Sequence, residues 1–367
     1  MHGYSHGGNA VYEDGKENII DLSASINPMG MPDDVIGAIA REIAKCSRYP
    51  DSSSRKLREK IAEFEGVDPD WIFCGNGASD VIFRLPKAVR AKKTAVTAPT
   101  FSDYERSAIS FGSEIVRQPL SSIGGFAING TYAELISTEK PDLAFICNPN
   151  NPTGRLTEPG IIAQLLEFGR KVDTVVAVDE CFLDFTENAD TYTSKCFLKE
   201  FQNLVILKAY TKTFALPGIR LGYAICADTA MNNRLYSSGP DWPVSNLAQA
   251  AGLAALESAE SFIKETVSLV ASGRAALERE LARIGYNVFP ASANYVFLHN
   301  PFKFHLHKEL ERIGIRVRPC GNFHGLDDSY CRIAVSSDET NKKLLTAVED
   351  ITAAMAGKTC FKQIGKP

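Results

Sequence analysis

A lysine in an otherwise apolar segment is an unusual placement and a candidate for covalent chemistry. Lys212 lies in the segment Tyr210–Tyr223, where hydroxyl residues flank it and most other side chains are apolar. Lysine is rarely buried without a purpose, and a desolvated amine is a good nucleophile for an aldehyde. Lys208, four residues earlier, is the rival candidate. Arg220 follows Lys212 in the same loop region and is suited to clamp a phosphate in bidentate fashion.

A glycine-rich turn offers a second site, for an anion. In Cys74–Asp80, which reads CGNGASD, the glycines allow a tight turn between a strand and a helix. The backbone N–H groups of Ala78 and Ser79 would then point from a helix N-terminus, as in phosphate cradles. The simpler interpretation is an ordinary turn with Ser79 as its helix N-cap.

Two further motifs follow apolar runs. Asn148–Gly154, which reads NPNNPTG, combines two X-Pro bonds with several side-chain amides, more constraint than a plain turn needs. The segment Val176–Glu180 is predicted to be a buried strand that ends in two acidic residues, Asp179 and Glu180. Asp179 either caps the next helix or pairs with a buried cation, such as a protonated pyridine nitrogen.

The elements that position these motifs alternate between strand and helix. Helical patterns such as Ser102–Gly112 and Glu158–Lys171 separate short apolar runs, which is typical of βαβ units and a mostly parallel sheet. Several runs lack polar alternation, as expected for a sheet covered on both faces. The predicted strands are Trp71–Cys74, Thr94–Ala98, Leu143–Cys147, Thr174–Asp179, Leu204–Ala209 and Tyr223–Ala227.

The two ends of the chain differ from this α/β middle. An amphipathic helix is expected over Asp33–Cys46, and a long helical stretch over Leu247–Ile284 precedes the strands Asn294–Leu298 and Tyr330–Val335. We therefore expect a smaller α+β domain built from both chain ends. The predicted division is an N-terminal arm (1–32), a large domain (33–245, with 33–50 partly in the small domain) and a small C-terminal domain (246–367).

Composition narrows the class of protein. The 367 residues are 44% hydrophobic and carry a formal charge of −4, which argues against a nucleic-acid partner. No apolar run approaches the length of a membrane span, and the polar, Gly-rich N-terminus is not a signal peptide. Nine scattered cysteines without a C-x-x-C pair favour free thiols in a reducing cytoplasm, and the histidines lack metal-binding spacing.

In this order, the motifs GNGASD, NPNNPTG, VDE and TKxxxLPGxRxGY resemble the aspartate-aminotransferase superfamily of fold type I pyridoxal-phosphate (PLP) enzymes. The resemblance spans about residues 6–348. It implies a large domain with a mostly parallel seven-stranded sheet, a smaller α+β domain and PLP as the cofactor.

The resemblance also implies roles for individual residues. Lys212 would hold PLP as a Schiff base, Asp179 would keep the pyridine nitrogen protonated, Asn151 would bond the phenolic oxygen, and Tyr104 would stack on the ring. Tyr49 would reach the cofactor phosphate of a partner subunit, which implies a homodimer. The residues expected around the chain's own cofactor phosphate are Gly77, Ala78, Ser79, Thr211 and Arg220.

Three positions concern the substrate and the tuning of the cofactor. Arg332, in CRIAVS, matches the arginine that grips the substrate carboxylate, although a strand-edge arginine in a surface pair would look the same. Phe182 stands where most aminotransferase relatives have a tyrosine that donates to the phenolic oxygen. Ala209 replaces a frequent hydroxyl residue, so the site has fewer donors than usual.

Within the superfamily, the closest resemblance is to the threonine-phosphate decarboxylases of cobalamin biosynthesis. The segment His6–Asn9, Phe182 and the stretch Arg316–Asp327 carry it. A phosphorylated amino-acid substrate needs a second anion site, for which Arg318, His6 and the Asn27 amide are candidates. His6 as part of a tail and Arg318 as a surface cation are the simpler interpretations. Histidinol-phosphate-type transamination is the leading alternative function, and a regulatory protein with this fold but no turnover is the third.

Overall fold

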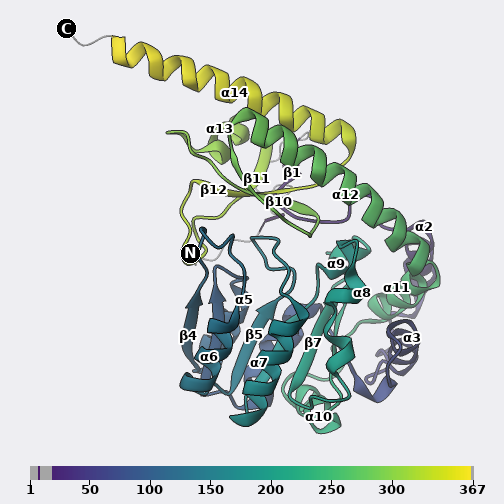
Figure 1. Ribbon diagram of the computed structural model, residues 1–367. Coiled ribbons are helices and arrows are strands. Elements are labelled where there is room, and N and C mark those ends of the chain that lie inside the picture. Colours follow the sequence, from purple (N-terminus) through teal and green to yellow (C-terminus); the bar gives the residue numbers. More distant parts are fainter. Residues whose placement is uncertain (1–6, 9–18, 365–367) are drawn as a thin grey trace.

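The computed structural model of the chain describes residues 7–8 and 19–364, and it has two lobes (Figure 1). The larger lobe is built on a seven-stranded sheet and the smaller one on a five-stranded sheet. The long helix α12 (Ala259–Ile284) runs from the large lobe to the small one (Figure 1). His6, a candidate substrate residue, lies outside the described residues.

The large sheet has the strand order β2-β8-β7-β6-β5-β3-β4, and only β8 runs antiparallel to its neighbours. The predicted seven-stranded, mostly parallel sheet is thus confirmed. Parallel neighbours end at the same edge, so the loops after them meet there. The strands are β2 (Ile72–Gly75), β3 (Lys93–Ala98), β4 (Glu114–Pro119), β5 (Leu143–Cys147), β6 (Val175–Asp179), β7 (Leu204–Ala209) and β8 (Gly222–Ile225).

Helices cover both faces of this sheet because its central strands are apolar on both sides. In β5, Ala144 and Ile146 join one core, while Leu143 and Phe145 join the other. The first core lies under α3 (Arg55–Glu65), α6 (Gly130–Glu139), α7 (Pro159–Lys171) and α11 (Asn246–Glu257). The second core lies under α4 (Ala78–Val89), α5 (Asp103–Phe111) and α10 (Thr229–Ser237).

The small sheet combines the two chain ends, as predicted. β1 (Ile20–Leu22) pairs in parallel with β11 (Ile315–Pro319), and the order β1-β11-β12-β10-β9 continues with antiparallel pairs. Its core also takes leucines from α12, and its other elements are β9 (Asn287–Phe289), β10 (Tyr295–His299), β12 (Tyr330–Ala334), α13 (Leu306–Arg312) and α14 (Asp338–Ile364). The far end of α14 projects beyond this lobe (Figure 1).

The predicted helical stretch over 247–284 is two helices, α11 and α12. The break falls at Ser258, whose φ of −118° and ψ of 14° are not helical. Gly252 and Gly273 lie inside the helices instead. A Cβ at Gly252 would lie 2.5 Å from Leu221 Cδ2, so this glycine allows α11 to pack closely on the β7–β8 connection.

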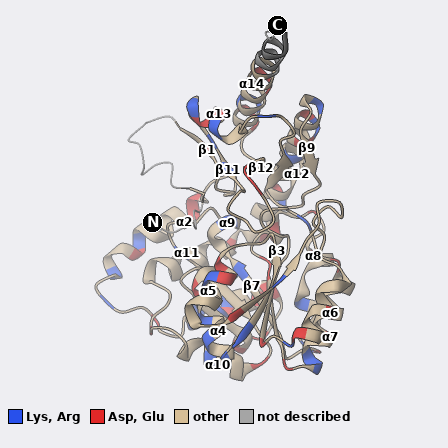
Figure 2. Cartoon of the chain, turned by 90° about the vertical axis from the view of Figure 1, so that its left-hand side faces the viewer, with Lys and Arg blue, Asp and Glu red and all other residues tan. Residues whose placement is uncertain are grey.

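The remaining helical elements are short or lie at the edge of the large lobe. α2 (Asp33–Glu42) precedes a 3-10 turn and packs with α11, and α8 (Ala189–Tyr192) and α9 (Tyr210–Thr213) have one turn each. Among the described residues, no helix has the length and hydropathy that a membrane span requires. Lys, Arg, Asp and Glu are interspersed over the outer helices of the large lobe (Figure 2).

Candidate active site

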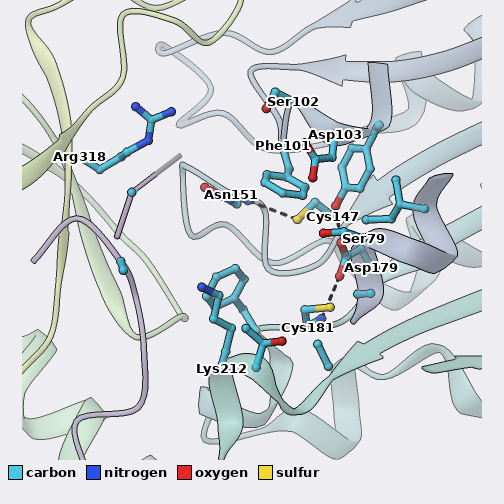
Figure 3. A pocket seen from close by; sticks show the side chains of 18 of the residues that line it. Ser79, Phe101, Ser102, Asp103, Cys147, Asn151, Asp179, Cys181, Lys212 and Arg318 are labelled. Atoms are coloured by element: carbon cyan, nitrogen blue, oxygen red, sulfur yellow. Dashed lines mark hydrogen bonds between the residues drawn. The ribbon is translucent and has the colours of Figure 1, made fainter. Parts of the chain in front are cut away.

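A pocket of about 300 Å³ lies between the lobes, at the edge where the parallel strands of the large sheet end (Figure 3). Loops that follow β2, β3, β5, β6 and β7 line it from the large lobe, and β11 and β12 line it from the small lobe. The structure brings together ten residues that the sequence predicts for the site: Ala78, Ser79, Tyr104, Asn151, Asp179, Thr211, Lys212, Arg220, Arg318 and Arg332.

The turn before α4 forms a cradle for an anion. Gly77 caps the helix with a φ of +81°, which favours glycine, and the helix then begins at Ala78. A Cβ at Gly77 would lie 2.8 Å from the Arg220 guanidinium, and one at Gly222 would lie 2.3 Å from the Ala78 nitrogen. Because both glycines lack a side chain, the Arg220 guanidinium can lie against Gly77, and the N-terminus of α4 can lie against Gly222. Free N–H groups at a helix N-terminus beside an arginine suit a phosphate.

Asp179 lies at the end of β6, and burial raises the pKa of its carboxyl group. Its Oδ2 accepts a hydrogen bond from the Tyr104 hydroxyl at 2.6 Å, and its Oδ1 accepts one from the Cys181 N–H at 3.0 Å. These two donors favour the carboxylate and oppose the effect of burial. A protonated pyridine nitrogen beside Asp179 would favour the carboxylate further.

The structure shows contacts of Tyr104 other than the predicted stacking on the cofactor ring. Its side chain is 0% exposed, and its ring stacks on Phe145 with centroids 4.7 Å apart. With its ring packed there and its hydroxyl bonded to Asp179, Tyr104 supports the carboxylate. Phe101, three residues earlier, presents its ring to the pocket instead (Figure 3).

The two candidate lysines have opposite electrostatic surroundings. Burial, with Arg332 and Arg220 nearby, lowers the pKa of Lys212 from 10.5 to about 8. Burial also acts against the charged form of Lys208, but Asp184, Glu65 and Glu180 outweigh it and raise the pKa of that lysine. Lys208 therefore stays a cation at neutral pH, whereas Lys212 loses its proton more easily and can supply the neutral amine that a carbonyl reaction needs.

Arg332 and Asn151 are bonded to each other across the pocket. Arg332 donates to Asn151 Oδ1 at 2.5 Å and to the Ser23 carbonyl at 2.9 Å, and its guanidinium lies 5.0 Å from the centre of the Tyr295 ring. Burial lowers the pKa of Arg332. Among the described residues its Nε has no hydrogen-bond partner. This arginine therefore orients the Asn151 amide and retains capacity for an anion.

Arg318 is the second buried arginine of the small lobe. It donates to the Pro319 carbonyl at 2.8 Å and to Asn322 Oδ1 at 2.9 Å, and it lies over the Phe323 ring. Arg318 and Arg332 are partners in the β11–β12 register. Burial, followed by the positive charge of Arg332, lowers the pKa of Arg318 to about 10. An anion bound between the two guanidinium groups would relieve this repulsion.

Three predicted residues that the structure describes do not line the pocket: Gly77, which caps α4 beside it, Asn27 and Tyr49. Asn27 is buried and donates through Nδ2 to the Thr213 carbonyl at 2.7 Å and to Thr266 Oγ1 at 2.8 Å. Its amide hydrogens are thus used within the protein, which differs from the predicted contact with substrate. Tyr49 is 80% exposed and stacks on Trp242 with centroids 4.5 Å apart, so it is accessible to another molecule.

Several pocket residues were not predicted as site residues. Phe101 and Asp103 belong to the same segment as Tyr104, and Cys181 follows Asp179 by two residues. Their nearness to predicted residues was the available signal. Phe323 likewise lies in the stretch Arg316–Asp327 that carries the resemblance, whereas Ser23 reaches the pocket only because the two lobes come together. Phe182 and Ala209, the two departures from the common pattern, both line the pocket.

The pocket fits PLP, the cofactor that the sequence motifs imply. A carboxylate suited to the pyridine nitrogen, a glycine-lined cradle suited to the phosphate and an amine suited to the aldehyde face one cavity. The Phe101 ring offers an apolar face to an aromatic heterocycle (Figure 3). The Asn151 Nδ2 amide, which lines the same pocket, has the hydrogens that the predicted bond to the phenolic oxygen needs.

Comparison with known proteins finds matches over nearly the whole chain. The family model described as aminotransferase class I and II matches residues 17–348. The threonine-phosphate decarboxylase of Salmonella typhimurium is 30% identical over 359 residues, which covers 96% of this chain and 98% of the relative. The histidinol-phosphate aminotransferase of Symbiobacterium thermophilum is 31% identical over 339 residues, 91% of each chain.

Solved structures give the same result for the fold. The histidinol-phosphate aminotransferase from Clostridium acetobutylicum has a TM-score of 0.85 and 29% identity, and covers 92% of this chain and 100% of its own. The L-threonine-O-3-phosphate decarboxylase from Porphyromonas gingivalis has a TM-score of 0.79 and 24% identity, with 91% and 99% covered. The chain is thus about equally similar to proteins with two different activities.

The opposite surroundings of Lys208 and Lys212 predict where and at what pH the protein bonds an aldehyde. The rate at which cofactor-free protein captures PLP covalently should rise with pH through about 8, because the neutral amine of Lys212 is the nucleophile. Borohydride trapping followed by peptide mapping measures both the rate and the position. Lys212→Ala should abolish the label, and a label on Lys208 would contradict the assignment.

The close approach of Gly222 to Ala78 predicts the effect of a single methyl group. Gly222→Ala should displace the α4 N-terminus and weaken PLP binding by roughly 10-fold or more. Gly218→Ala is the matched control, because a Cβ there meets no atom within 4 Å. Equilibrium dialysis measures both affinities, with the melting temperature as a check on folding. Equal affinities of the two variants would be inconsistent with the cradle.

Proposed function

The chain belongs to the aminotransferase class I and II family, and from this premise we propose that it decarboxylates a small O-phosphorylated amino acid. The proposed reaction converts L-threonine O-3-phosphate to 1-aminopropan-2-yl phosphate, a step of cobalamin biosynthesis. The cofactor is pyridoxal 5′-phosphate. The observation that carries the proposal is the pair of buried guanidinium groups, Arg318 and Arg332, that line the pocket with Lys212.

The cofactor residues act through the contacts described above. Bound PLP supplies an electron sink for the bond that breaks at the substrate α-carbon. Lys212 holds the cofactor covalently and, with its lowered pKa, can carry a proton at Nζ. Asp179, which accepts a hydrogen bond from Tyr104, would favour the protonated pyridine nitrogen, and Phe101 would cover one ring face. The cofactor phosphate is held by the Gly77–Ser79 turn, Thr211 and Arg220.

The two arginines that line the pocket from the small lobe would each bind one of the substrate's negatively charged groups. Arg332 binds the carboxylate, and Arg318 binds the phosphate on the side chain. With both ends held, the two arginines would fix the orientation of the substrate α-carbon beside bound PLP, which would supply the electron sink for loss of the carboxylate. His6 remains a proposed third phosphate contact. Gly7, next to it, lines the pocket.

Transamination of a histidinol-phosphate-type substrate is the second candidate, since relatives with that name are similarly identical. In that reaction bound PLP would supply the electron sink for loss of the α-proton instead of the carboxylate, and Lys212 would carry that proton at Nζ. The apolar ring of Phe182 in the pocket favours the decarboxylase, because most aminotransferase relatives have a tyrosine donor at that position.

We also propose that the protein is a homodimer in which Tyr49 completes the partner's site. Large apolar residues that are exposed support this. Trp242 stacks on Tyr49 and is 44% exposed. Ile36 in α2 and Ile43 in the 3-10 turn after α2 are 51% and 60% exposed. A reducing compartment such as the cytoplasm suits the chain, because all eight cysteines whose side chains the structure describes are free thiols.

The choice between the two reactions can be made by product analysis. Holoenzyme incubated with L-threonine O-3-phosphate should release carbon dioxide in proportion to substrate consumed, without an added keto acid. Stoichiometric transfer of the amino group without gas release would reject the decarboxylase and favour the transaminase.

The same assay tests the arginine pair. Arg318→Met should lower kcat/KM for the phosphorylated substrate by roughly 100-fold, because it removes charge-assisted bonds to the phosphate. Arg316→Met is the matched control: Arg316 is on the same strand, does not line the pocket and contacts Glu311. An equal loss in both variants would speak against a phosphate site at Arg318.

The homodimer makes a prediction about mixed subunits. Tyr49→Ala and Lys212→Ala proteins should each have little activity, but subunits exchanged between them should recover about a quarter of wild-type activity. Half of the dimers would be mixed, and each of these has one intact site. Activity after reversible unfolding of the mixture measures the recovery. No recovery, with dimers formed, would show that Tyr49 does not act across the interface.

A further inference from the structure

A buried ion cluster lies next to the pocket and outside it. Lys208 Nζ is 3.0 Å from Asp184 Oδ1 and 3.2 Å from Glu65 Oε1. Glu65 also binds Lys195 Nζ at 2.8 Å and accepts from the Tyr223 hydroxyl. We call Glu65, Asp184 and Lys208 the Lys208 cluster. None of its members lines the pocket, and the cofactor roles described above do not use it.

The Lys208 cluster is bonded to the turn that carries Lys212. Thr213 Oγ1 donates to Asp184 Oδ2 at 2.9 Å, and the Thr213 side chain is 0% exposed. The carbonyl of the same residue accepts from Asn27 Nδ2 at 2.7 Å, and the Lys212 carbonyl accepts from the Asn27 N–H at 3.2 Å. Three bonds from distant parts of the chain therefore fix Lys212 and Thr213.

These bonds matter because little else holds the amine. α9 is a single turn, and it has no side-chain cap. Among the described residues, Lys212 Nζ has no hydrogen-bond partner in the pocket. The direction of the side chain therefore depends on where its main chain lies, and that position depends on the anchors of the turn.

We propose that Asp184 and Thr213 are positioning residues, through which the Lys208 cluster aims the Lys212 amine at the cofactor aldehyde. The proposal rests on the proposed function, in which Lys212 bonds the cofactor. The step that they assist is a condensation: a carbon–nitrogen double bond forms between amine and aldehyde, and one water leaves. Lys208 stays protonated and therefore does not react with the aldehyde, but its ion pair with Asp184 holds that carboxylate in place.

The test compares two threonines that donate to buried acids. Thr193 Oγ1 donates to Glu180 Oε2 at 2.8 Å, almost the same length as the Thr213 bond to Asp184 at 2.9 Å, but Thr193 does not touch the Lys212 turn. Thr213→Val and Thr193→Val thus remove the same kind of bond, and only the first removes an anchor of Lys212. Thr213→Ser keeps the hydroxyl, and Asp184→Asn keeps the shape of the acceptor but not its charge.

Two measurements on cofactor-free protein give the readouts. In stopped-flow absorbance, Thr213→Val should slow covalent capture of PLP by roughly 10- to 100-fold, because small displacements of a reacting group have effects of this size. Thr193→Val should stay within about 2-fold of wild type, and Thr213→Ser should restore most of the rate. Asp184→Asn should slow capture in the same direction. Hydrogen exchange should accelerate over residues 210–216 in Thr213→Val but not in Thr193→Val.

Capture at the wild-type rate by both Thr213→Val and Asp184→Asn would overturn the positioning role, as would equal slowing by Thr193→Val. A Lys212→Ala control separates this failure from that of the proposed function. If Lys212→Ala still captures PLP covalently, the role of Lys212 itself is wrong. If it does not, while the positioning variants behave as wild type, only the present proposal fails.

Discussion

The site depends on lowering the pKa of one buried lysine while another, four residues away, holds its proton tightly. Burial disfavours the charged form of both, so the difference must come from their neighbours. Lys212 faces arginines and a pocket, and Lys208 faces three carboxylates. The strand direction places the two amines in separate environments, since β7 ends between them. The charged residues around each lysine therefore leave Lys212, and not Lys208, as the candidate nucleophile.

Positive charge is the second organising feature of the pocket. Arg220, Arg318 and Arg332 face it together with Lys212, and this much positive charge in one cavity is unfavourable without bound anions. The protein places most of these cations on different elements and even on different lobes. Ligands that carry phosphate and carboxylate groups would therefore stabilise the contact between the lobes as well as fill the cavity.

The sequence was sufficient to predict the large sheet and most of the cofactor residues, because buried parallel strands form continuous apolar runs and the motifs follow directly at their ends. It was not sufficient for β1, β4, β9 and β11, which are short, lie at sheet edges or carry charged residues. Tyr104 and Phe101 are both aromatic, are three residues apart and line the pocket, and only the packing of Tyr104 on Phe145 shows which of the two rings is already stacked within the protein. Likewise, the partners of Asn27 lie 186 and 239 residues away.

The antiparallel strand β8 has a consequence for how the protein can vary. Because the chain turns back between β7 and β8, one short connection carries both Lys212 and Arg220, and the same connection ends at Gly222 against the α4 turn. The aldehyde end and the phosphate end of the cofactor are thus gripped by a single span of fixed length. Insertions or deletions within it would displace both contacts at once, whereas a substitution such as Gly218→Ala, where a Cβ meets no atom within 4 Å, would leave both in place.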